Sequence, residues 1–307
     1  MKKFLLKVAL FFVLAAVLDV LFGWGFEVLR SKACKGQTHK NEYIANECVD
    51  DILILGSSKA DHHYVPSVFE DSLGLTCYNA GEMGCGIIPA YIRYKMVRER
   101  KKPKLVIYEV TQVYDYLEDN GYSSYLGVMR QYTDNKMVRD VYTNFSDELE
   151  GLRLFSNMYK NNSKLIMNMK DLLGEPDGFN GYEPLYGRIN NAGTKKPKAD
   201  MKKNKRQIDP LKYAYFEKLI EDVKESEIPV LFVISPTFNG TIRNDDYQPT
   251  FELSQEYDIP VIDYRQCEEF VGNRVLFRDA GHLNHEGALV FSKSIVSQIR
   301  KYIIISQ

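Results

Sequence analysis

The stretch that decides the fold is residues 51–58, DILILGSS, where a short apolar run leads directly into a glycine and two serines. This run ends in a polar turn, and residues 64–73 then show helical spacing, which predicts a strand, a turn and a helix. The apolar residues are continuous rather than alternating. The strand is therefore predicted to be covered on both faces, as in a parallel sheet.

The same alternation of predicted strand and helix recurs on both sides of a long middle region. Further strands are predicted at residues 75–79, 103–111, 228–234 and 259–264, and helices at residues 87–100, 211–226, 248–257 and 287–299. Five strands joined by right-handed helical crossovers predict a doubly wound parallel sheet in a three-layer α/β/α domain. We assign this domain to residues 51–307. Residues 115–209 are predicted to be an insertion, helical at 123–143 and 146–173 and loop-like beyond.

The charge balance argues against a dedicated nucleic-acid binder. The 307 residues carry 40 Lys and Arg against 41 Asp and Glu, so no global cationic field is present to attract phosphates. One local exception is a basic run in the insertion, formed by Lys195, Lys196, Lys198, Lys202, Lys203, Lys205 and Arg206. Two interpretations stay open: a solvated surface loop, or a segment that contacts an anionic polymer or lipid head group.

The amino-terminal segment is predicted to be a membrane anchor. Lys2, Lys3 and Lys7 precede an apolar run over residues 8–18, and the run resumes after Asp19. Positive charge before an apolar segment predicts a cytoplasmic amino terminus, with the rest of the chain outside. We interpret residues 1–27 as an uncleaved single-pass anchor in the cell membrane and residues 28–50 as a juxtamembrane stretch. A cleaved signal peptide is the alternative.

The five cysteines predict no metal site, because they form no CxxC pair and no histidine cluster completes a ligand set. Cys34 and Cys48 flank a short polar stretch and are candidates for a disulfide in an exported chain. Cys77 is expected to be a core thiol.

Three short motifs carry candidate chemistry, each next to a predicted strand end or helix start. Gly56-Ser57-Ser58 places a hydroxyl at the carboxyl edge of the sheet, although such a turn often serves only as a helix cap. In the loop from Asn79 to Gly84, the glycines allow a ligand oxygen to approach backbone N–H groups. Alternatively, the glycines serve only a loop backbone that requires positive φ.

The third motif is Asp279-Ala-Gly-His282, near the carboxyl terminus. An Asp three residues before a His can accept the imidazole Nδ1 proton and leave Nε2 to take a proton from a hydroxyl. A structural histidine in a helix-capping turn is the alternative. His285 is expected to be a capping or surface residue.

Taken together, these motifs resemble those of the SGNH (GDSL-type) hydrolase superfamily over roughly residues 50–302. The resemblance implies a flavodoxin-like strand order, with Ser58 as nucleophile, Asp279 and His282 as its partners, and Ser58 and Gly84 as oxyanion-hole donors. Ser57 stands where the family has Asp. The family's Asn-bearing third motif is missing at residues 110–114, and Thr111, Gln112 and Asn239 stay open as substitutes.

The Gly-Ser-Ser motif and the anchor are similar to a divergent branch that contains D-alanyl transfer and polysaccharide O-acetyl transfer proteins. The resemblance implies acyl-ester hydrolysis or O-acyl (acetyl) transfer on an acylated envelope polysaccharide or glycolipid, without a cofactor, in contact with envelope-modification machinery. The rival hypothesis is a non-catalytic module of the same fold that binds envelope glycan or helps to assemble such machinery.

Overall fold

The computed structural model describes residues 1–118, 126–145, 148–162, 164–173, 178–190, 207–240 and 245–303. The chain divides into two compact units, each built from two stretches of sequence. Unit 1 comprises residues 1–46 and 126–177, and unit 2 comprises residues 47–125 and 178–307. The basic run at residues 195–206 lies outside the described residues.

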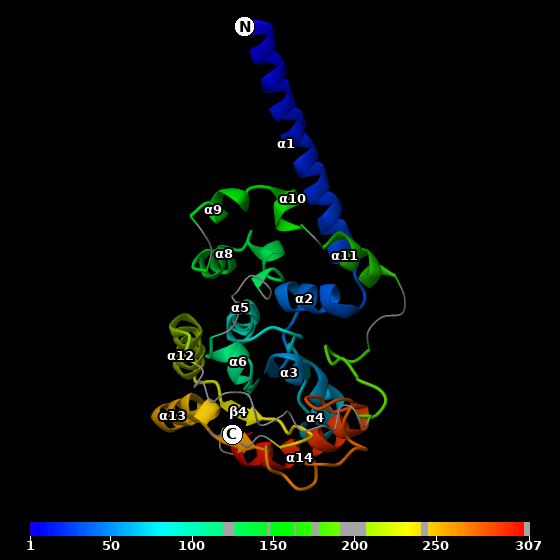
Figure 1. Ribbon diagram of the computed structural model, residues 1–307, viewed down its shortest axis with the longest axis vertical. Coiled ribbons are helices and arrows are strands. Elements are labelled where there is room, and N and C mark those ends of the chain that lie inside the picture. The colour runs from blue at the N-terminus through cyan, green and yellow to red at the C-terminus, as the bar shows by residue number, and fades with distance from the viewer. Residues whose placement is uncertain are drawn as a thin grey trace. The chain divides into compact units, whose positions relative to one another are not determined.

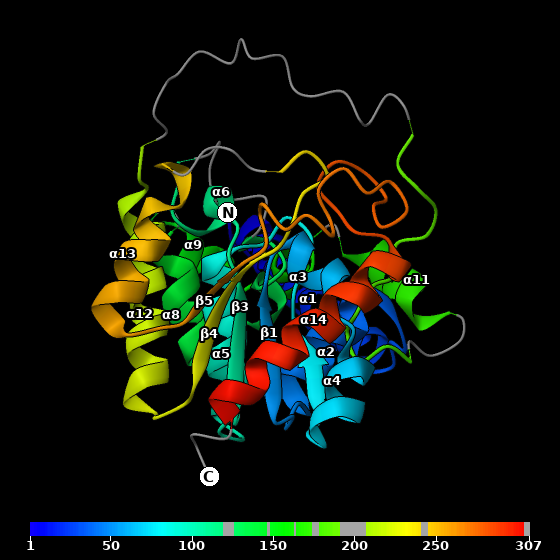
Figure 2. The same cartoon turned by 90° about the horizontal axis from the view of Figure 1, so that it is seen from below.

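Unit 2 contains the predicted five-stranded sheet, with all strand pairs parallel and the strands in the order β2-β1-β3-β4-β5 (Figure 2). The strands are β1 (Ile52–Gly56), β2 (Cys77–Asn79), β3 (Leu105–Glu109), β4 (Val230–Ile234) and β5 (Val261–Asp263). This is the flavodoxin-like order, in which ligands bind beyond the carboxyl ends of the strands. The predicted doubly wound fold is confirmed.

Helices cover both faces of this sheet, which explains why its central strands are apolar up to Glu109, the last residue of β3. On one face, Ile54, Ile107 and Val233 share a core with Phe69 of α4 (Pro66–Leu73) and Phe291 of α14 (His285–Ile303). On the other face, the rings of Tyr108 and Phe232 pack against Phe216 of α12 (Pro210–Glu225). Two further helices of unit 2 match the predicted positions: α5 (Ile87–Arg98) and α13 (Gln248–Tyr257).

One element of unit 2 differs from the prediction. The polar turn expected after β1 is largely a helix, α3 (Ser58–His63). Gly56 makes the change of direction possible, because its φ of 139° suits glycine alone. A Cβ at this position would also lie 2.7 Å from the carbonyl oxygen of Glu109. The chain therefore turns at Gly56 and starts α3 at Ser58.

Unit 1 is entirely helical in its described residues (Figure 1). Its elements are α1 (Lys2–Ser31), α2 (Gly36–Asn46), η1 (Arg130–Tyr132), α8 (Lys136–Thr143), α9 (Glu150–Arg153), α10 (Asn157–Lys160) and α11 (Leu165–Leu172). The two long helical stretches predicted for the insertion are thus broken into short helices. Asn135 and Ser156 start new helices, since their side chains accept hydrogen bonds from the first-turn N–H groups of α8 and α10.

Cys34 and Cys48, the candidate disulfide pair, are both thiols in the structure. The Cys34 thiol faces the backbone carbonyl oxygens of Asp171 and Leu172, and the Cys48 thiol lies 3.5 Å from Asp50 Oδ2. Burial raises the pKa of Cys48 to about 12, so this thiol is a poor nucleophile for disulfide formation.

Candidate active site

The first candidate residue, Ser58, is half-buried at the amino terminus of α3, directly beyond the carboxyl end of β1. Its neighbour Ser57 is fully buried and donates a hydrogen bond to Thr111 Oγ1 at 2.8 Å. The two serines therefore differ in role. Ser57 ties α3 to the end of β3, whereas the hydroxyl of Ser58 has a different partner.

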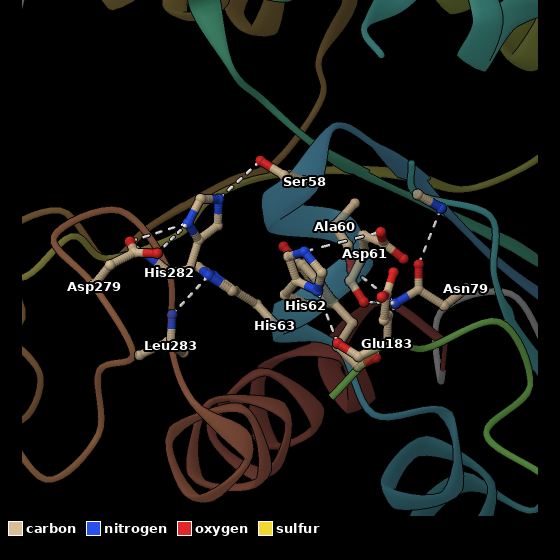
Figure 3. A network of polar contacts seen from close by, with 12 residues as sticks. Ser58, Ala60, Asp61, His62, His63, Asn79, Glu183, Asp279, His282 and Leu283 are labelled. Carbon is tan, nitrogen blue, oxygen red and sulfur yellow. Dashed lines mark hydrogen bonds and ion pairs between the residues drawn. The ribbon is translucent and has the colours of Figure 1, made fainter. Parts of the chain in front are cut away.

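That partner is His282, whose Nε2 lies 2.9 Å from Ser58 Oγ although 224 residues separate the two (Figure 3). On the other side of the ring, Nδ1 lies 3.0 and 3.1 Å from the carboxylate oxygens of Asp279. An ionised carboxylate only accepts, so the neutral ring carries its proton on Nδ1 and Nε2 accepts from the serine hydroxyl. The structure brings Ser58, His282 and Asp279 into one hydrogen-bonded chain.

A tight turn fixes the carboxylate of Asp279. Its Oδ1 accepts from the backbone N–H groups of Gly281 and His282 at 2.8 and 2.9 Å. Burial alone would raise the pKa of Asp279, but hydrogen bonds from the His282 ring and from these two N–H groups prevail. The pKa falls to about 2, which keeps the carboxylate ionised at neutral pH.

The predicted donor Gly84 lies in the loop that follows β2, at a φ of 72°. The side chain of Asn79 anchors this loop, since it donates to the carbonyl oxygens of Ala60 and Tyr64 and accepts from Gly81 N–H. A Cβ on Gly81 would lie 2.5 Å from the backbone nitrogen of Asp61, so the loop packs directly on α3. The loop therefore stays beside the helix that carries Ser58. The role of Gly84 as a donor stays a prediction.

A buried ion pair also anchors this loop to α5. Glu82 forms an ion pair with Arg93 of α5, and both side chains are at most 2% exposed. Arg93 also donates to the carbonyl oxygen of Ala80 at 2.8 Å. Sequence reasoning missed this pair, because a Glu in a loop and an Arg in a helix form no motif.

The region that replaces the family's third motif uses other polar groups. Thr111 accepts from Ser57, as described above, and the structure gives no contact that singles out Gln112 or Asn239 as an oxyanion donor. At the end of β3, the buried carboxylate of Glu109 accepts from Tyr64 and from the hydroxyl and N–H of Ser235. Burial raises the pKa of Glu109, while nearby Lys59 opposes that rise.

Lys59 is a second residue that the sequence did not single out, although it directly follows Ser58. Its Nζ lies 3.5 Å from the carbonyl oxygen of Ser235, and the side chain is half-buried. Burial lowers the pKa of this ammonium group, while the Glu109 carboxylate acts in the opposite direction. A cation thus follows the candidate nucleophile in the first turn of α3.

His63 supports the histidine loop. Its Nε2 accepts from the backbone N–H of Leu283 at 3.0 Å, and its ring lies edge-on to His282 at 6.1 Å. Burial lowers the pKa of His63 well below its usual value, with His282, Lys59 and His62 adding to that effect. His63 is therefore a neutral acceptor beneath the loop that carries His282.

One group among the described residues has the spacing of a metal site. Asp61, His62 and Glu183 offer ligand atoms that lie within 4.8 Å of one another. The Nδ1 of His62 already lies 2.8 Å from the carbonyl oxygen of Glu183, and its Nε2 is 4.0 Å from Asp61 Oδ2. These contacts orient His62.

No protein-family model matches the chain, and no curated protein matches its sequence. Solved structures resemble it only distantly. A protein from Lactobacillus plantarum aligns at 11% identity and a TM-score of 0.44, covering 82% of this chain and 97% of its own. A putative lipolytic protein of the G-D-S-L family from Desulfitobacterium hafniense aligns at 10% identity and a TM-score of 0.39, covering 80% and 98%.

A putative acylhydrolase from Bacteroides fragilis aligns at 13% identity and a TM-score of 0.39, covering 88% of this chain and 99% of its own. A GDSL-like lipase from Bacteroides thetaiotaomicron aligns at 10% identity and a TM-score of 0.37, covering 83% of this chain and 88% of its own. The candidate site is therefore described from the geometry of Ser58, His282 and Asp279 alone.

Proposed function

We propose that the chain is a serine-dependent acyl-ester hydrolase or O-acyltransferase. The observation that carries this proposal is the continuous chain of hydrogen bonds from Ser58 Oγ through the His282 ring to the Asp279 carboxylate. A general base within 2.9 Å of a hydroxyl, oriented by a third group, is the arrangement that activates a serine nucleophile.

The proposed reaction has two halves. His282 Nε2 takes the proton of Ser58 as Oγ attacks the ester carbonyl carbon, and the N–H groups of Ser58 and Gly84 stabilise the oxyanion. The ester C–O bond then breaks, His282 returns the proton to the leaving alkoxide, and the acyl group stays on Ser58. In the second half, His282 deprotonates water or an acceptor hydroxyl, whose oxygen attacks the acyl carbon; the bond from that carbon to Ser58 Oγ breaks, and His282 returns the proton to Oγ.

A fluorophosphonate probe on the full-length protein in detergent tests the nucleophile directly. We expect Ser58→Ala to abolish labelling and Ser57→Ala to retain most of it, because the Ser57 hydroxyl is buried against Thr111. Equal loss of labelling in both variants would mean that Ser58 is wrongly assigned as the nucleophile. Absence of labelling in the folded wild type would favour the rival hypothesis of a non-catalytic glycan-binding or assembly module.

The location and the substrate form the finer part of the proposal. Helix α1 is long and apolar enough to cross a membrane, a property that a signal sequence shares. The lysines before it favour a cytoplasmic amino terminus, so we place unit 2 outside the cytoplasm. An acyl-transfer site tethered there reaches envelope material, and we propose an acylated polysaccharide or glycolipid as substrate, with acetyl as the acyl group.

A further inference from the structure

Beyond residue 31, unit 1 gathers most of the large apolar side chains that the described part of the chain exposes. Eight of the fourteen such residues lie between positions 149 and 173: Leu149, Leu152, Phe155, Met158, Leu165, Ile166, Met169 and Leu173. Phe155 and Ile166 are 80% and 73% exposed. Soluble surfaces rarely concentrate apolar groups in this way, and such a patch marks an interaction surface. We call this patch the 149–173 face; it is carried by α9, α10, α11 and the residues that flank them.

The 149–173 face is attached to α1 at a defined height. Residues 2–18 of α1 are exposed and Asp19 is its first half-buried residue, and α10 and α11 contact the carboxyl-terminal half of the helix (Figure 1). The carboxylate of Asp19 accepts four hydrogen bonds at 2.6–3.2 Å, from the Ser156 hydroxyl, the Asn157 N–H and side-chain amide, and the Met158 N–H. Asp19 therefore caps the amino terminus of α10.

Gly23 allows α10 to approach α1 closely. It lies four residues after Asp19 and so on the same side of the helix. A Cβ at Gly23 would lie 2.5 Å from Cγ of Asn157. The absence of a side chain at position 23 thus lets the start of α10 lie directly against α1.

The position of Asp19 along α1 sets the depth of α10 in a bilayer. The hydrocarbon core is about 30 Å thick, which takes about 20 helical residues at 1.5 Å each. A span that begins after Lys7 therefore ends at about residue 27. Asp19 lies about 12 Å short of that end, inside the hydrocarbon. Its hydrogen-bond partners at residues 156–158 must lie at the same depth.

The backbone around α10 is suited to a medium without water. Every N–H group from residue 152 to residue 162 has an acceptor within the chain, including the two that donate to Asp19 and the one that donates to the Ser156 hydroxyl. Unsatisfied backbone groups are expensive in hydrocarbon, so segments at membrane depth must satisfy them internally. The charged side chain of Glu150 is likewise buried and bonded to Tyr159.

We propose that the 149–173 face is embedded in the outer leaflet of the bilayer, where it forms a lipid-contacting collar around α1. The proposal rests on the membrane-spanning role proposed for α1. It also explains the hydrogen bonds of Asp19, because a carboxylate in the hydrocarbon needs donors such as those at residues 156–158. Cleavage of α1 as a signal peptide would remove Asp19 and leave the start of α10 without its cap.

Tryptophan quenching in vesicles with brominated acyl chains tests the proposal, because Trp24 is the single tryptophan of the chain. Wild-type Trp24 reports on α1. Phe155→Trp and Ile166→Trp, each combined with Trp24→Phe, report on the segment just before α10 and on α11. Tyr186→Trp in the same background is the matched control, since Tyr186 is an exposed aromatic residue of unit 2.

We expect quenching at positions 155 and 166 to approach that of Trp24 and to exceed that of position 186 several-fold. Quenching of Trp24 without quenching at 155 and 166 would overturn the proposal while leaving the anchor intact, and would assign the face to a protein contact such as a second copy. If Trp24 itself is not quenched, the anchor and the collar both fail. Fluorophosphonate labelling of Ser58 is independent of either outcome.

Discussion

At the scale of single residues, His63 shows how a buried neutral imidazole organises the site without taking part in the chemistry. Its Nε2 accepts the N–H of Leu283, the residue that follows His282. A protonated ring has no acceptor nitrogen, so protonation would break this contact and place a positive charge 6.1 Å from the His282 ring. We regard His63 as a positioning residue for the histidine loop.

The depressed pKa of His63 predicts a pH dependence of stability. Below its usual pKa of 6.5 the unfolded chain binds a proton that the folded chain does not, so the free energy of unfolding falls as the pH drops. This one group therefore makes the folded protein less stable at pH 5 than at pH 7. Urea unfolding at both pH values should show a smaller loss in His63→Gln, whose side chain offers an acceptor but does not titrate.

Comparing wild type with His63→Gln also separates the titration of His63 from that of its charged neighbours. Lys59 and His62 on α3 and His282 in the opposing loop face its ring, and all three are unchanged in the variant. An identical pH dependence in wild type and His63→Gln would mean that the ring is protonated in the folded protein. The acceptor role would then be wrong.

At the scale of elements, the ion pair between Glu82 and Arg93 joins the loop after β2 to α5. Arg93→Met would leave a buried, uncompensated carboxylate, and we expect it to cost about 3–5 kcal/mol of stability. The double variant Glu82→Gln/Arg93→Met should recover most of that loss. Its kcat on an aryl acetate should stay reduced about tenfold or more with little change in KM, because oxyanion contacts act mainly in the transition state.

The kinetic readout separates positioning from folding. If kcat returns to the wild-type value together with stability, the pair serves the fold alone and the loop needs no fixing for catalysis. If KM changes and kcat does not, the loop binds substrate and does not stabilise the oxyanion.

The central sheet was predictable from sequence because its strands are buried on both faces. Residues 52–55, 105–108 and 230–234 are therefore continuous apolar runs. Unit 1 was not predictable to the same extent. The segment around Phe155 exposes its apolar residues instead of burying them, so its spacing suggested longer amphipathic helices than the structure contains. The helical form of residues 58–63 was also missed, because a six-residue helix gives little periodicity.

The candidate site divides in the same way. Ser58, Asp279 and His282 are recognisable because local motifs carry them. His63 and Arg93 are not, since the partner of His63 lies 220 residues away and Arg93 lies within a helix whose other face is equally buried. Contacts of this kind depend on how distant segments pack, and a single sequence contains no signal for them.

At the scale of the whole molecule, the distribution of charge bears on the substrate proposed for the site. The chain has a net charge of −1, yet seven of its basic residues lie between positions 195 and 206, with Asp200 as the one acid among them. Such a concentration produces a local positive field that reaches about 10 Å at an ionic strength of 0.1 M. An anionic envelope polymer would be drawn toward it, whereas a small neutral ester would not.

We therefore expect replacement of Lys195, Lys196, Lys198, Lys202, Lys203 and Lys205 by Gln to weaken use of a charged acylated polymer. The salt dependence of that reaction should also become flatter, because the screened attraction is lost. Hydrolysis of a neutral aryl acetate should stay nearly unchanged, since the substitutions leave Ser58, His282 and Asp279 in place. Initial rates with both substrates between 50 and about 300 mM salt measure the two effects together, over the range in which the screening length shortens. Equal loss on both substrates would assign the run to folding, and no loss on either would make it a solvated loop without a role in substrate choice.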